Sequence, residues 1–200
     1  MTTHPVHFRV HSSPGMARIH VLIRLLLLMA LGALGWSGLY FLAYLAVPAM
    51  VALLISQKGG PGYLTEDAPR ITRALTWMAH AYAYLWLLTD SFPSSAATSV
   101  VELQIEPGPA PTMRLALLRV VYSIPALLLL ALLSCVASVL WMVGAILVLV
   151  RGCLPHVIAD FLELTLRYQF RLMAWHLSLV DRYPSLGEGV EHAVPGARAL

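Results

Sequence analysis

The stretch Val120–Val150, VVYSIPALLLLALLSCVASVLWMVGAILVLV, runs for 31 residues without an acidic, basic or histidine side chain. A second such stretch, Leu25–Gln57, reads LLLLMALGALGWSGLYFLAYLAVPAMVALLISQ and runs for 33 residues. A helix needs about 20 apolar residues to cross a bilayer, so each stretch is long enough to do so. The two stretches predict a membrane protein.

The whole chain shares this apolar character. Of its 200 residues, 59% are hydrophobic and only 12% are charged, whereas an ordinary soluble domain has roughly 45–50% and about 25%. This composition excludes a soluble globular enzyme, a disordered chain and a nucleic-acid-binding domain. The net charge of +3 is a mild basic excess. The two cysteines, Cys135 and Cys153, do not form a pattern that predicts a disulfide framework.

The length of each apolar stretch predicts a helical hairpin. One straight helix of this length would measure roughly 45–50 Å, far more than the ~30 Å hydrocarbon core of a bilayer. We therefore expect hairpins at 18–57 and 113–150, with tips near 32–38 and 133–138, where small residues permit a tight turn. Full crossing and entry into one leaflet are both compatible with this pattern.

The two halves of the chain contain the same elements in the same order. Each half begins with a short segment of alternating apolar and polar residues, which predicts a strand. A Pro/Gly stretch, the apolar block, a basic Gly/Pro turn and an aromatic-rich helix follow. The predicted strands are 5–10 and 100–105, and the predicted helices after the turns are 70–92 and 156–183.

Each half also ends on the same short motif, an aspartate followed by an aromatic residue and a proline. The motif contains Asp90 and Pro93 in the first half and Asp181 and Pro184 in the second. We expect these four residues to be structural and to define a repeat. The chain is then two tandem repeats, 1–93 and 94–185, followed by a tail at 186–200. The predicted fold class is an all-α integral membrane protein with two such repeats.

These motifs resemble a bacterial membrane family known as domain of unknown function 4389. The pattern of that family is an apolar hairpin, a Gly-x-x-Pro turn and an Arg-aromatic-x-x-Arg helix that ends in Leu-Thr-Asp-x-Tyr-Pro. The first half departs from it, because Thr76 and His80 stand where the second half has arginines. The resemblance implies a membrane location and brings no activity. The second half carries it through Gly152, Pro155, Arg167, Tyr168, Arg171, Asp181, Tyr183 and Pro184.

Four arginines are candidates for contact with lipid headgroups or the membrane interface. Arg24 and Arg119 lie just before the apolar blocks, so we expect their side chains to extend to the headgroups. Arg167 and Arg171 fall on one stripe of an amphipathic helix that we expect to lie in the interface. Their guanidinium groups can bind lipid phosphates, and the alternative is a charged stripe that faces water or Glu163.

The distribution of basic residues predicts the topology. If each half crosses the membrane twice, all 13 basic residues lie on one side, as expected of a cytoplasmic face. This places both strands on that side, where they can pair as a small sheet. We expect a multi-pass protein of the bacterial cytoplasmic membrane with both termini in the cytoplasm.

No recognised catalytic, nucleotide-binding or metal-binding motif appears in the sequence. We expect no enzyme activity, no catalytic, cofactor-binding or metal-binding residues, no cofactor and no nucleic-acid partner. The first hypothesis is a scaffold or accessory subunit of a larger membrane complex, whose partners are lipids, other membrane subunits or copies of itself. The alternative is a membrane-shaping or lipid-handling hairpin protein. A transporter or channel ranks lower, because the apolar blocks offer almost no polar lining.

Overall fold

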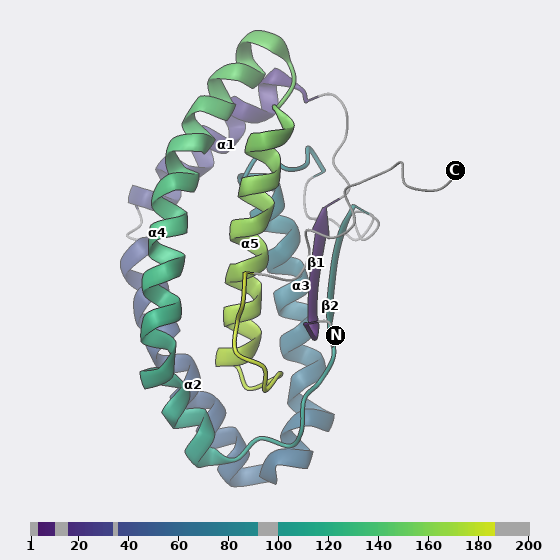
Figure 1. Cartoon of the computed structure of the whole chain (residues 1–200), viewed down its shortest axis with the longest axis vertical. Coiled ribbons are helices and arrows are strands. Elements are labelled where there is room, and N and C mark those ends of the chain that lie inside the picture. The colour runs from purple at the N-terminus through teal and green to yellow at the C-terminus, as the bar shows by residue number, and fades with distance from the viewer. Residues whose placement is uncertain (1–3, 11–15, 34–35, 92–99, 187–200) are drawn as a thin grey trace, which may run out of the picture.

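A computed structural model describes residues 4–10, 16–33, 36–91 and 100–186, with only the main chain described over 32–33 and 36–45. The described part is mostly helical with one small sheet (Figure 1). In chain order its elements are β1 (Val6–Val10), α1 (Arg18–Ala33), α2 (Trp36–Gly62), the π-helical turn η1 (Tyr63–Asp67), α3 (Ala68–Leu85), β2 (Val101–Ile105), α4 (Met113–Arg151) and α5 (His156–His176).

These elements form three layers (Figure 1). Helices α1, α2 and α4 make one outer layer, and α4 packs against α2 and α5. Helices α3 and α5 make the middle layer. The sheet covers the other side of the middle layer, where β1 packs against α5 and β2 packs against α3. Each strand therefore packs against the helix from the opposite half of the chain.

The hairpin predicted at 113–150 is wrong, because α4 is one continuous helix of 39 residues. Its start is capped by the side chain of Thr112, and it ends at Gly152, whose φ of 73° belongs to the left-handed region that glycine adopts readily. No glycine or proline interrupts the expected tip. Ser138 instead donates its hydroxyl proton to the carbonyl of Ser134, and a turn there would leave main-chain groups without partners in apolar surroundings.

The hairpin predicted at 18–57 is wrong as well, because α1 and α2 do not fold back on each other. They follow one another along α4 in the opposite direction (Figure 1). At one end, the Met16 amide donates to the carbonyl of Gly152. At the other end, the backbone at Gly60 lies directly against Pro111. The part of the expected tip at 34–35 lies outside the described residues.

Helices α3 and α5 both end earlier than the sequence predicts, at Leu85 and His176 rather than at 92 and 183. Both ends are Schellman motifs, in which one residue takes a left-handed conformation after the helix. This residue is Leu87 (φ 62°) after α3 and Ser178 (φ 58°) after α5. In both motifs the next amide donates to a carbonyl five residues earlier. Neither residue is glycine, so the sequence carries no signal for these endings.

The two predicted strands are confirmed, and they pair with each other in an antiparallel sheet. The register joins Val6 to Ile105 and Val10 to Val101, with Phe8 opposite Leu103 at the centre. Alternate residues point to opposite faces of a strand. The apolar face covers the helices, and Phe8 stacks on the Phe170 ring of α5 with 5.4 Å between ring centroids.

Helix α5 is a core helix, which corrects the prediction that it lies in the membrane interface. Its apolar residues Leu162, Leu166 and Leu172 are fully buried. Arg171 is buried as well. The sheet covers the polar stripe of α5 that the sequence analysis assigned to water or lipid, and only residues near its start, such as Asp160, remain exposed.

Candidate functional site

Two buried arginines occupy equivalent positions in the two halves of the fold. Arg119 of α4 donates to the carbonyls of Trp175 and Val180 at the end of α5 and forms an ion pair of 2.9 Å with Asp181. Its guanidinium carbon also lies 5.2 Å from the centre of the Trp175 ring. Because a helix exposes unpaired carbonyls and a partial negative charge at its C-terminus, a cation there is stabilising.

Arg24 of α1 makes the corresponding contacts in the first half. It donates to the carbonyl of Thr89 and forms an ion pair of 2.8 Å with Asp90. Its guanidinium carbon lies 4.5 Å from the centre of the Tyr84 ring. Asp90 also accepts a hydrogen bond from the amide of Ala17. Each arginine therefore ties the start of an outer helix to the end of the inner helix from the same half.

These contacts correct the expectation that Arg24 and Arg119 extend to lipid headgroups. Arg24 is 0% exposed and Arg119 is 5% exposed, so neither guanidinium reaches the surface. Each arginine instead pairs with a carboxylate that lies more than 60 residues away in the sequence. A charge beside an apolar block can pair with a lipid headgroup or with a carboxylate of the protein. The fold selects the second alternative, because it brings Asp90 and Asp181 next to the two arginines.

Three of the four residues that the sequence predicts to define a repeat are described, and they follow the ends of α3 and α5. Asp90 and Asp181 hold the two arginines, and Pro184 is buried after the end of α5. Pro93 lies outside the described residues.

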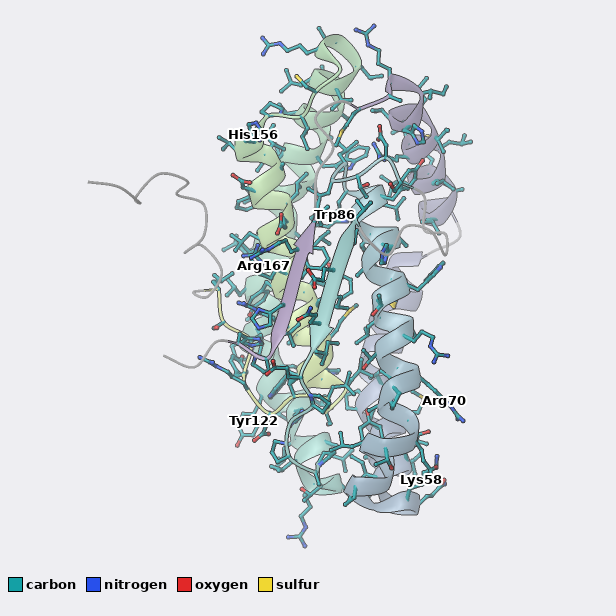
Figure 2. All side chains as sticks on the ribbon, turned by 90° about the vertical axis from the view of Figure 1, so that its right-hand side faces the viewer. Lys58, Arg70, Trp86, Tyr122, His156 and Arg167 are labelled. Atoms are coloured by element: carbon teal, nitrogen blue, oxygen red, sulfur yellow. The ribbon has the colours of Figure 1, made fainter. Side chains whose placement is uncertain are left out.

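Arg167 and Arg171 point toward the edge of β1, and Figure 2 places Arg167 beside this strand. Arg167 pairs with Glu163 at 2.8 Å, as one of the two alternatives from the sequence predicts. Its Nε donates to the carbonyl of Phe8. Arg171 donates to the carbonyl of Ser185 at 2.6 Å and, at a long 3.5 Å, to that of Val6. The two arginines thus bind outward carbonyls of β1 that have no strand partner.

A cavity of about 250 Å³ lies between this edge and the outward face of the sheet. Sequence reasoning found the two arginines of α5 but missed the strand residues beside them. The alternation of each strand was the available signal, since it places these polar side chains on one face. The polar residues that line the cavity are His7, Arg9, Glu102, Gln104, Arg167 and Arg171.

Two buried tyrosines join the layers. The hydroxyl of Tyr63 donates to the carbonyl of Leu177 at 2.5 Å, and that of Tyr168 donates to the carbonyl of Ala126 in α4. Burial raises the pKa of Tyr63 above its ordinary value, and the charge of Asp67 acts in the same direction. Burial also raises the pKa of Tyr168 to about 12. Both phenols therefore keep their protons at neutral pH.

Among the described residues, no group of three or more His, Cys, Asp or Glu side chains could hold a metal ion. Within the same ranges, α4 is the one helix that is both long and apolar enough to cross a membrane. Only 17% of its most apolar window is buried against the rest of the fold.

Comparison with known proteins finds a family match over part of the chain. No curated protein and no solved structure matches the chain at a significant level. Residues 114–186, which contain α4, α5 and the Asp181 turn, match the model of a family described as Domain of unknown function (DUF4389). The second half of this chain is therefore similar to that family, as its motifs indicate.

Proposed function

We propose that this protein is a non-catalytic membrane scaffold that acts as an accessory subunit of a larger assembly in the bacterial cytoplasmic membrane. The observation that carries the proposal is the outer face of α1 and α4. Large apolar side chains are exposed along α4 and along α1 from Ile19 to Met29. Soluble monomers rarely expose a continuous apolar patch on this scale, whereas lipid or apolar helices of another subunit would cover it.

The inner face of α4 supports the same proposal. Its buried positions are mostly small, and from Ala116 to Ala126 they recur at spacings of three and four residues. In membranes, small residues let helices approach closely, while large apolar side chains face lipid. The outer face of α4 follows this arrangement, as Leu128, Leu132, Val139 and Met142 are each more than 60% exposed. The buried set is Ala116, Arg119, Ser123, Ala126, Ala137, Gly144, Ala145 and Val148.

We further propose that the chain contains two copies of the unit found in the matched family. The matching contacts of Arg24 and Arg119 support this, because their positions differ by 95 residues and those of their partners Asp90 and Asp181 by 91. The sheet register supports it too. Phe8 pairs with Leu103, which lies 95 residues later, so the two strands are related by an approximate twofold axis.

A second candidate function, membrane shaping, is favoured by the length of α4. Its 39 residues measure about 58 Å, nearly twice the ~30 Å hydrocarbon core. An upright α4 would also carry α5 and the polar side of the sheet into the hydrocarbon, where charged groups are costly. An orientation along the membrane keeps that side in water and places the apolar helices in one leaflet, where they would act as a wedge.

The first experiment is extraction of the protein from native membranes in mild detergent, followed by native gel sizing and mass spectrometry. A stoichiometric companion protein supports the accessory-subunit proposal and identifies the process that it serves. A particle that contains only this chain and lipid would overturn that proposal and favour self-association or membrane shaping.

A labelling experiment separates a membrane-spanning α4 from the wedge. Single cysteines replace Met113 and Arg151 at the two ends of α4, both exposed, in a variant without Cys135 and Cys153. An impermeant thiol reagent is added outside intact cells. If α4 crosses the membrane once, its ends lie on opposite sides, so one end is labelled and the other is protected. Protection of both ends, together with labelling of both after the cells are opened, supports the wedge.

A further inference from the structure

We propose that the cavity at the edge of β1 is a binding site for a small phosphate-type oxyanion. Residues of both strands line the cavity, and the sheet lies on the opposite side of the molecule from the apolar layer of α1, α2 and α4 (Figure 1). Its volume of about 250 Å³ is below that of pockets for drug-sized ligands. A phosphate group or a small phosphate ester is the size of ligand that it suits.

The charge of the cavity wall favours an anion. Three arginines and one glutamate line it, which is a formal excess of two positive charges with His7 counted as neutral. Glu163 lies outside the lining but pairs with Arg167, so the net excess around the cavity is one positive charge. Arg9 lies directly opposite Glu102 in the sheet register, but among the described residues no ion pair joins them. An oxyanion with one negative charge would balance this excess.

The geometry of the arginines favours an oxyanion in particular. Guanidinium groups match phosphate oxygens with planar, paired donors, and such bonds are strong because both groups are charged. Main-chain contacts hold the two arginines of α5 in place, with Arg167 bound to Phe8 and Arg171 bound to Ser185. A ligand would therefore meet cations whose positions are already fixed, so less side-chain entropy is lost on binding.

The test measures binding of inorganic phosphate to the full chain in mild detergent by calorimetry at constant ionic strength. We expect saturable binding that weakens about tenfold in Arg9→Gln, because one charge-assisted contact is lost. Arg9 is exposed, so this variant should fold. The matched control is Arg70→Gln, which removes the same charge from an exposed position on α3, well away from the sheet (Figure 2).

A second arm separates free phosphate from a lipid headgroup. The protein is reconstituted with vesicles of phosphatidylcholine alone or with added phosphatidic acid, and retention of the acidic lipid is measured. Loss of phosphate binding in Arg9→Gln but not in Arg70→Gln supports a site for a soluble ligand. The same pattern confined to phosphatidic acid supports a headgroup site. If wild type binds neither probe, or if both variants weaken binding equally, the proposal is wrong.

Discussion

The two buried arginines provide a sharp test of the fold, because their ion pairs are equivalent in position but differ in exposure. Arg24 is fully buried, and the side chain of its partner Asp90 is 21% exposed. The side chain of Asp181, the partner of Arg119, is 60% exposed. We predict that Asp90→Asn destabilises the protein much more than Asp181→Asn does.

The expected loss in the free energy of unfolding depends on which contacts each arginine keeps in the variant. In Asp90→Asn the Arg24 charge stays buried without its counterion, and a broken buried ion pair costs about 3 kcal/mol. In Asp181→Asn the lost partner was mostly solvated, so the cost is about 0.5 kcal/mol. Arg119 also keeps its bonds to the carbonyls of Trp175 and Val180. The expected difference in the free energy of unfolding is about 2.5 kcal/mol.

The assay is equilibrium unfolding of the detergent-solubilised full chain, followed by circular dichroism. Asparagine has nearly the same shape as aspartate and can still accept a hydrogen bond, so the two variants compare the loss of charge alone. Equal destabilisation, or a larger effect for Asp181→Asn, would refute the assignment of the first pair as buried and the second as solvated.

Three further predictions concern the helix ends, the tyrosines and the packing of α2. Ser178→Gly should stabilise the protein by about 1 kcal/mol, because glycine adopts the left-handed conformation of this position without strain. The substitution also removes a buried hydroxyl that has no partner among the described residues. A lower melting temperature for the variant would contradict this prediction. The folded-state pKa of Tyr168 lies near 12, above the ordinary 10.0, so folding binds its proton more tightly. This contribution to stability is complete below about pH 10 and is lost as the pH rises toward 12. The melting temperature of Tyr168→Phe should therefore fall less between about pH 10 and 12 than that of the wild type. An equal fall in both proteins would contradict this prediction. Gly60→Ala should destabilise the protein by about 1–3 kcal/mol, because the added carbon would lie 2.4 Å from the backbone oxygen of Pro111. That clash outweighs the gain in helix propensity of about 1 kcal/mol. The control is Gly62→Ala, which should be nearly neutral because its added carbon meets only a side chain. Chemical denaturation compares the stability of the two variants.

Local patterns in the sequence determined the elements of this protein. Alternation of apolar and polar residues predicted both strands within one residue of their observed bounds. The basic glycine turn predicted where α4 ends, because only a residue that tolerates positive φ fits there. The order of motifs indicated two similar halves, and the same motifs indicated the similarity that the comparison finds for 114–186.

Only the tertiary structure decided how the elements are used. Hydropathy indicates that a side chain avoids water, but it does not say whether a 31-residue block folds back or runs on as one helix. Arg24 and Arg119 needed partners, but those partners lie more than 60 residues away. The stripe of Arg167 and Arg171 looks like a solvent or lipid face in isolation. It becomes the wall of a cavity because β1, from the other half of the chain, packs against α5.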